Sequence, residues 1–294
     1  MRNSTRDTFK DKWEHNSQLA FGETLREGSD IFSWILRRNG FGTSDDLKEY
    51  LKDKRRLLDA GCGNGRVTAL LRRYSPETTE VVGIDLVSSE IARENLEAHH
   101  LSYNVSFLER DLLGDLKDLG KFDFVYCQEV LHHISDPEQG FQNLTKLLLP
   151  GGEIAIYVYK KKAPAREYVD DYVRGKISGL AYEEAIQVCK QITELGKSLS
   201  QHGITIQVPR VDALEIEEGE YDLQRFIYHF FMKCFWNKDL SFQENVAINF
   251  DWYYPQVATR YTLEEVREWF IKVKLRIVHE YLDFYGITVR GKLV

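Results

Sequence analysis

The stretch LLDAGCGNG (residues 57–65) decides the fold of this sequence. It places Gly61, Gly63 and Gly65 directly after an apolar run that is typical of a buried strand. A glycine-rich turn between a strand and a helix lets the backbone approach a nucleotide closely. The dinucleotide pattern G-x-G-x-x-G would need glycine where this chain has Arg66, and no G-x-x-x-x-G-K-[ST] run occurs. The turn therefore favours a nucleoside cofactor that carries no pyrophosphate.

Acidic residues follow three successive predicted strands. Asp59 ends the first strand, where a carboxylate would repel pyrophosphate but attract an ammonium group, such as that of S-adenosylmethionine. Asp85 ends the second strand, where a carboxylate can accept hydrogen bonds from both ribose hydroxyls, as it also does in NAD-binding proteins. Asp111 follows the third, where it can accept from the adenine amino group with Leu112 beside the ring; an N-cap is the structural alternative. Together these acids predict a site for S-adenosylmethionine.

Strand and helix patterns alternate through the first half of the chain and return at its end. This rhythm predicts an α/β fold with a doubly wound, mostly parallel seven-stranded Rossmann-like sheet, right-handed crossovers and an antiparallel C-terminal hairpin. Strands are expected at 55–61, 80–86, 105–111, 122–128, 152–159, 274–282 and 285–293. Helices are expected to begin near Arg66, Glu90, Pro137 and Leu263, the third ending at the LPGG run, residues 149–152.

The ordered motifs resemble those of class I S-adenosylmethionine-dependent methyltransferases over residues 55–160. DAGCGNG and VLHHISDP are most similar to the small-molecule enzymes related to the ubiquinone-biosynthesis methyltransferases. The D/N-P-P-Y/F signature of many amino-methylating enzymes is absent at 128–131. The resemblance implies S-adenosylmethionine as cofactor, S-adenosylhomocysteine as product and no metal. The expected cofactor contacts are Asp59, Gly61, Cys62, Gly63, Gly65, Asp85, Leu86, Asp111, Leu112 and Gln128.

Methyl transfer from a sulfonium depends mainly on positioning the acceptor atom near the methyl group. A general base is needed only when the acceptor must lose a proton. Glu129, His132 and His133 follow the fourth predicted strand and are the candidates for that role. The structural alternative is that the histidines hold the loop. No metal site is expected, because adjacent histidines seldom point the same way and no third ligand is evident.

The sequence divides into three zones. Residues 1–54 form a predicted N-terminal helical segment, and residues 55–160 with 259–294 form the predicted cofactor-binding core. Residues 161–258 are expected to form an inserted, mostly helical and aromatic-rich cap over the active site.

Aromatic and basic residues of the insertion and its exit are candidates for holding the substrate. QRFIYHFFMKCFW (residues 224–236) is expected to be a helix, and NFDWYYPQVATRY (residues 249–261) a loop before the last helix. Aromatic rings suit a planar or cationic ligand, and arginines suit a carboxylate or phosphate. A packing layer with surface arginines is the structural alternative. The substrate candidates are Arg225, Tyr228, Tyr253, Tyr254 and Arg260.

Composition limits the partners of the chain. Its 294 residues carry a net charge of −7, which disfavours a broad nucleic-acid surface. A membrane span needs about 20 consecutive apolar residues, and no apolar run approaches that length. The first 16 residues lack the apolar region of a secretory signal peptide. We therefore expect a cytoplasmic enzyme for a small, plausibly anionic molecule. A tRNA or other nucleic-acid methyltransferase and a non-catalytic S-adenosylmethionine-binding protein are the alternatives. The oligomeric state, a homodimer included, stays open.

Overall fold

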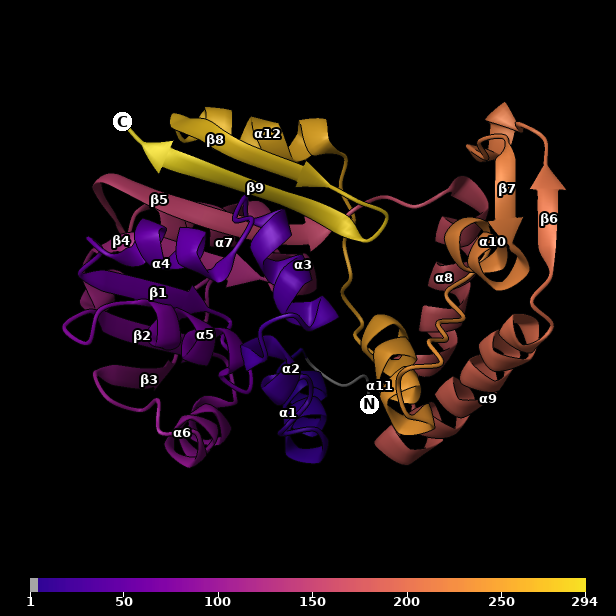
Figure 1. The fold of residues 1–294 in the computed structure, drawn as a ribbon, viewed down its shortest axis with the longest axis horizontal. Coiled ribbons are helices and arrows are strands. Elements are labelled where there is room, and N and C mark those ends of the chain that lie inside the picture. The colour runs from indigo at the N-terminus through magenta and orange to yellow at the C-terminus, as the bar shows by residue number, and fades with distance from the viewer. Residues whose placement is uncertain (1–4) are drawn as a thin grey trace. The chain divides into compact units, whose positions relative to one another are not determined.

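The computed structural model describes residues 5–294, and these form a seven-stranded sheet in the order β3-β2-β1-β4-β5-β9-β8 (Figure 1). The first five strands of this order are parallel, whereas β9 runs antiparallel to both of its neighbours. This confirms the expected fold class. The strands are β1 Arg56–Ala60, β2 Glu80–Asp85, β3 Val105–Glu109, β4 Phe122–Gln128, β5 Leu148–Tyr159, β8 Leu275–Leu282 and β9 Gly286–Leu293.

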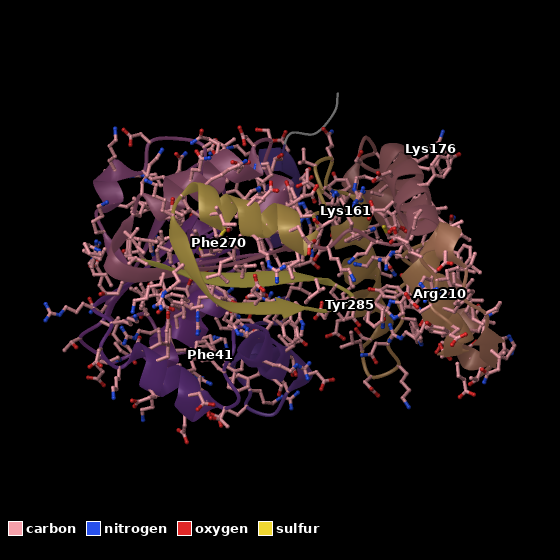
Figure 2. All side chains as sticks on the ribbon, turned by 90° about the horizontal axis from the view of Figure 1, so that it is seen from above. Phe41, Lys161, Lys176, Arg210, Phe270 and Tyr285 are labelled. Carbon is pink, nitrogen blue, oxygen red and sulfur yellow. The ribbon has the colours of Figure 1, made fainter. Side chains whose placement is uncertain are left out.

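Helices cover both faces of the sheet, since successive strand residues point to opposite faces and both faces are apolar. Leu58 of β1 packs in one buried cluster and its neighbour Leu57 in the other. Phe270 and Phe41 belong to these two clusters respectively, and Figure 2 shows them on opposite sides of the strands. The helices are α1 Thr5–His15, α2 Phe21–Leu25, α3 Asp30–Arg38, α4 Ser44–Leu51, α5 Arg66–Tyr74, α6 Ser89–Ala98, α7 Pro137–Thr145 and α12 Leu263–Lys272.

The described residues divide into two compact units. One unit contains the sheet and comprises Phe9–Lys160 with Thr259–Val294. The other comprises residues 5–8 and Lys161–Ala258. The elements of Lys161–Ala258 are α8 Pro164–Ile177, α9 Tyr182–Gln201, β6 Thr205–Val208, β7 Gly219–Asp222, α10 Leu223–Phe230 and α11 Phe242–Tyr253.

The chain leaves the sheet unit after β5 and re-enters it before α12 at adjacent points. Tyr261 N donates to Tyr159 O at 2.9 Å, and residues 160 and 261 form an isolated parallel bridge. Thr262 then begins α12 with a capping box that its hydroxyl and the Glu265 carboxylate form together. The exit and the return of the insertion are therefore hydrogen-bonded neighbours within the sheet unit.

Two local expectations were wrong. Pro150 lies inside β5 rather than at the end of α7, because Gly152 lets the β5 backbone approach that of β4: a Cβ there would lie 3.0 Å from Phe122 O. Residues 249–253 belong to α11, not to a loop, because the capping box at Ser241 starts a helix that runs to Tyr253. In addition, β6 and β7 form a small antiparallel sheet within the otherwise helical insertion.

The predicted helix over residues 224–236 also ends early, at Phe230. The side chain of Asn249, which is buried in α11, donates to Phe235 O at 3.0 Å and accepts from Phe235 N at 2.8 Å. Gln224 Nε2 donates to Cys234 O at 2.7 Å. These side-chain hydrogen bonds satisfy the backbone outside a helix, so tertiary contacts override the helical periodicity.

No helix within residues 5–294 combines the length and the apolar character that crossing a membrane requires.

Candidate active site

The glycine turn after β1 adopts a conformation that favours glycine at three positions. Gly61, Gly63 and Gly65 have φ angles of 81°, 53° and 85°, in the left-handed region. The backbone N–H groups of Gly61 and Cys62 donate to Ile84 O at 2.7 and 2.9 Å. These hydrogen bonds join the turn to the end of β2, next to Asp85.

The glycine turn also requires glycine for space. A Cβ at Gly61 would lie 2.2 Å from Val130 Cγ2, and one at Gly63 would lie 2.4 Å from Trp13 Cζ2. Asn64 Nδ2 donates to Ser17 O at 3.0 Å, which ties the same turn to the segment after α1. The backbone at 61–65 is therefore closely approached from two directions, as in a cradle for a nucleoside.

Asp85 supports the glycine turn directly. Its Oδ2 accepts from Gly63 N at 3.0 Å, and its Oδ1 accepts from Val87 N at 3.0 Å. The side chain is partly exposed, as is that of Leu86. Each carboxylate oxygen has a second lone pair that can accept from a ligand hydroxyl.

Asp111 lies on the surface after β3, and its Oδ1 accepts from Leu113 N at 2.9 Å. It caps a turn rather than the α-helix of the alternative interpretation, since the next helical residues are the 3₁₀ turn at Lys117–Leu119. Leu112 is buried, and its carbonyl accepts from Asn143 Nδ2 at 3.0 Å. Asp59 thus lies near the end of β1, Asp85 is the last residue of β2, and Asp111 follows β3, and these three strands are adjacent.

Asp59 is 2% exposed, and its Oδ2 accepts from the Thr68 hydroxyl at 2.6 Å. Burial raises the pKa of Asp59 to about 7, against the lowering effect of the Thr68 hydrogen bond, while the Asp85 charge raises it further and that of Arg66 lowers it. A cation that arrives beside this carboxyl would stabilise its charged form. Asp59 is therefore suited to receive an ammonium group.

Cys62 fills space inside the glycine turn. It is 4% exposed, and burial raises the pKa of its thiol well above the ordinary value. A thiol that stays protonated is a poor nucleophile.

Glu129 follows β4 with a φ of 59°, which is rare for a residue with a side chain. Its carboxylate forms an ion pair with Arg66 Nη2 at 2.9 Å. Burial would raise the pKa of Glu129, but the charges of Arg66, Arg38, Lys12 and His133 together lower it. Glu129 thus stays ionised and is a weak base.

His132 and His133 belong to a 3₁₀ turn, Leu131–His133, directly after Glu129. The His132 ring is fully buried and stacks on Tyr159 with the ring centroids 3.6 Å apart. The carbonyl of His132 accepts from Thr259 N at 2.8 Å. The structure therefore gathers the three candidate bases at the carboxyl end of β4.

Arg38 was not among the expected site residues. It ends α3, is fully buried and packs over the Trp34 and Tyr157 rings, with its Cζ 3.7 and 4.4 Å from their centroids. Gln128, an expected cofactor contact, is 7% exposed. The sequence signal for Arg38 is its spacing: it lies four residues after Trp34 and three after Ile35, on the apolar stripe of the helix.

Four of the five substrate candidates lie in the Lys161–Ala258 unit, whereas Arg260 lies in the sheet unit. Arg225 N donates to Asp222 Oδ1 at 3.0 Å, and its guanidinium donates to Trp236 O at 3.3 Å. Tyr228 is 3% exposed, with the Arg166 guanidinium over its ring. Tyr254 is fully buried, and its ring stacks on that of Phe250.

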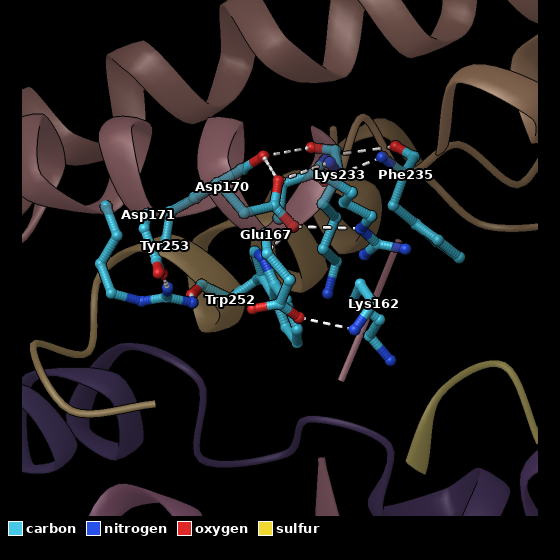
Figure 3. Close-up of polar contacts among 11 residues, drawn as sticks. Lys162, Glu167, Asp170, Asp171, Lys233, Phe235, Trp252 and Tyr253 are labelled. Carbon is cyan, nitrogen blue, oxygen red and sulfur yellow. Dashed lines mark hydrogen bonds and ion pairs between the residues drawn. The ribbon is translucent and has the colours of Figure 1, made fainter. Parts of the chain in front are cut away.

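Asp170 of α8 binds several partners inside this unit (Figure 3). Its Oδ2 accepts from Arg166 Nε at 3.0 Å and from Trp252 Nε1 at 2.8 Å. Its Oδ1 accepts from the Tyr253 hydroxyl at 2.7 Å and from Lys233 N at 2.8 Å. The Tyr253 hydroxyl is therefore hydrogen-bonded inside this unit.

Cations gather around His229 in the same unit. Burial is the largest cause that lowers the pKa of His229 to about 4, and the charges of Arg166, Arg225 and Lys162 contribute to the same shift. His229 therefore lies among basic side chains and stays neutral. No group of three or more metal-ligating side chains occurs within residues 5–294.

Comparisons with known proteins show which proteins the chain is similar to. Residues 51–177 match the family model described as a methyltransferase domain. The ubiquinone biosynthesis O-methyltransferase of Coxiella burnetii is 31% identical over 33% of this chain and 41% of its own length. The juvenile hormone acid O-methyltransferase of Bombyx mori is 36% identical over 33% of this chain and 36% of its own. The chain thus spans less than half the length of these curated relatives.

A solved structure shares the fold over most of the chain. The structure of PKMT2 from Rickettsia typhi matches with a TM-score of 0.54 and 15% identity, covering 84% of this chain and 52% of that one. At this identity the likeness concerns the fold alone.

Proposed function

We propose that the chain is a class I S-adenosylmethionine-dependent methyltransferase and transfers a methyl group to an oxygen or nitrogen of a small molecule, since a methyltransferase-domain model matches residues 51–177 and the sheet has the expected strand order. The observation that carries this proposal is the glycine turn whose Gly63 N–H is bound by Asp85 at the end of β2. S-adenosylhomocysteine would be the second product.

The residues present fit the cofactor. The turn at 61–65 leaves room for no side chain at Gly61 or Gly63, Asp85 offers carboxylate lone pairs for ribose hydroxyls, and Asp59 offers a buried carboxyl for an ammonium group. When bound, S-adenosylmethionine supplies an electrophilic methyl group on a sulfonium. The nucleoside would extend over β2 and β3 toward Asp111, which leaves the ends of β4 and β5 for the acceptor.

Positioning is the main task of the remaining site residues. Glu129 keeps its charge because cations lower its pKa, so we assign it an electrostatic role rather than proton transfer. Where the acceptor must lose a proton, His132 and His133 are the remaining candidate bases.

The acceptor is proposed to be a small molecule with an anionic group. Both curated relatives are named as O-methyltransferases of small molecules, one of them of an acid, which supports an oxygen acceptor. The cations around His229 support an anionic group, and Arg225 and Arg260 are the candidates that the sequence indicates for holding it. The role of residues 161–258 as a cap stays a prediction.

Replacing Asp85 by Ala is expected to weaken S-adenosylhomocysteine binding by about 1.5–3 kcal/mol. The variant loses charge-assisted hydrogen bonds to the ribose and the acceptor for Gly63 N. Titration calorimetry measures the effect, and Asp115→Ala, at an exposed acid, is the matched control. Equal affinities of the two variants would contradict this role of Asp85.

Methyl transfer from labelled S-adenosylmethionine tests the acceptor class. We expect the label to enter a pool of small metabolites and not bulk tRNA or protein, because the chain carries a net charge of −7 and no long basic stretch that would bind a polyanion. Label found only in RNA or protein would overturn the proposal. The absence of transfer together with tight cofactor binding would favour the non-catalytic alternative.

A further inference from the structure

Arg38 is a buried cation whose N–H groups make no well-aligned hydrogen bond to residues 5–294. Its relative exposure is 0%, and its Nε, Nη1 and Nη2 atoms are all buried and unsatisfied, although the Tyr126 hydroxyl lies close enough to interact with the guanidinium. A buried charge without a partner is costly, so such a group is retained where a partner arrives from outside the chain.

Aromatic rings pack against the faces of the Arg38 guanidinium, so its N–H groups remain available only along its edge. Trp34 and Tyr157 pack over it, and Trp34 is itself held by a 3.0 Å hydrogen bond from its Nε1 to Asp283 Oδ2. The five N–H groups of a guanidinium lie in its plane and match the two oxygens of a carboxylate.

A second unpartnered donor lies in the same neighbourhood. Gln128 accepts with Oε1 from the Tyr126 hydroxyl, which leaves its buried Nε2 without a partner among residues 5–294. The Tyr126 hydroxyl also accepts from Asn39 Nδ2 at 2.9 Å. Burial raises the pKa of Tyr126, and the charge of Arg38 and hydrogen bonds from Asn39 and Arg38 oppose this. Arg38 and Gln128 thus lie beside one hydroxyl and both have unsatisfied donors, while Asn39 Oδ1 is a buried unsatisfied acceptor at the same hydroxyl.

Charges of both signs lie around Arg38. Glu129 is the carboxylate that Arg38 influences, and it already forms an ion pair with Arg66. Lys12 adds a further positive charge around Glu129. The carboxylates of Asp283 and Asp59 also act on Tyr157 and Tyr126, the tyrosines beside Arg38. An added anion would therefore be held by the unsatisfied guanidinium edge of Arg38 rather than attracted by an excess of cations.

The position of Arg38 beside strand β5 indicates which ligand brings this anion. Tyr157, on which it packs, belongs to β5 and pairs in register with Gln128 of β4. Asp85 and Asp111 lie on the other side of β1, at β2 and β3. Arg38 thus lies on the acceptor side of the site.

We propose that Arg38, with the Gln128 amide, binds a carboxylate of the methyl acceptor. This assignment rests on the proposed function and makes it narrower: the enzyme takes a carboxylic acid, and its anion is held at Arg38 rather than at Arg225 or Arg260. Because Arg38 is fully buried, the ligand reaches it when the covering side chains move aside.

Matched acid and amide pairs test the proposal by binding alone. Benzoate against benzamide and octanoate against octanamide are titrated by NMR into the full chain saturated with S-adenosylhomocysteine. The wild type is expected to bind each acid at least tenfold more tightly than its amide. Arg38→Met should lose at least tenfold in acid affinity, while amide and S-adenosylhomocysteine affinities stay within threefold. Arg38→Lys should lose part of the preference, since it keeps the charge without the planar fork.

Arg37→Met, at the exposed neighbouring residue, is the matched control and should behave as the wild type. A wild type without acid preference, or an Arg38→Met variant that keeps it, would overturn the assignment. So would an Arg38→Met variant that loses S-adenosylhomocysteine instead, or loss of the preference in Arg225→Ala or Arg260→Ala. A wild type that does not bind S-adenosylhomocysteine is a different result, because it overturns the proposed function itself.

Discussion

Asp59→Asn is expected to raise the free energy of unfolding of the ligand-free protein at pH 8 by up to about 4 kcal/mol. Burial raises the pKa of Asp59 from 3.8 to about 7. Between about pH 4 and pH 7, the folded state therefore keeps the Asp59 proton, whereas the unfolded state has released it. The stability that this proton contributes is present below pH 4 and is lost as the pH rises to 7. Asparagine does not titrate, so its advantage should grow between pH 4 and 7 and stay constant above.

Urea unfolding at several pH values between 4 and 8.5 measures this difference. Asp53→Asn, at an exposed carboxyl on the same unit, should follow the wild type throughout. S-adenosylhomocysteine should stabilise the wild type more than Asp59→Asn at pH 8, because its ammonium group compensates the buried charge. A constant difference between wild type and Asp59→Asn from pH 4 to 8.5 would contradict the buried titration.

Asp170→Ala is expected to lower the free energy of unfolding by about 3–5 kcal/mol, the range for removing one partner of a buried ion pair. The change leaves the Arg166 guanidinium buried without its carboxylate and removes the acceptor for the Trp252 indole and the Tyr253 hydroxyl. Thermal and urea unfolding of the full chain measure the loss.

The neighbouring residue supplies a close control for this prediction. Asp171 also pairs with an arginine, Arg174, but its side chain is 56% exposed, so Asp171→Ala should cost less than about 1 kcal/mol. Asp170→Asn keeps an acceptor and should fall between the two. If Asp170→Ala and Asp171→Ala were equally stable, the buried network would not hold the unit together.

Much of the sheet could be predicted because its signals are local. Apolar runs of strand length and glycine turns define β1 to β4 to within two residues, and Asp136 and Thr262 cap their helices as their patterns predict. The end of α10 could not be predicted, because Asn249, which holds Phe235 outside a helix, lies 14 residues further along the chain. The β6–β7 pair has too short a pattern to stand out within a helical region.

The site divides in the same way. Parallel strands bring their carboxyl ends to one edge, so residues after β1 to β4 meet there whatever the details of packing. The partners of Tyr253 and Trp252 could not be foreseen, since Asp170 lies more than 80 residues earlier in the sequence. Arg38 was missed because a charged residue on an apolar stripe is normally taken as a tolerated exception to the pattern.

The bridge between residues 160 and 261 bears on how the insertion can vary in length. Since the chain leaves and rejoins the sheet unit at hydrogen-bonded neighbours, a replacement segment of almost any length closes on the same two points, and loop-closure entropy grows slowly with length. Length changes within Lys161–Ala258 should therefore leave the strands and their register intact, because the two ends of the insertion stay hydrogen-bonded to one another in the sheet unit.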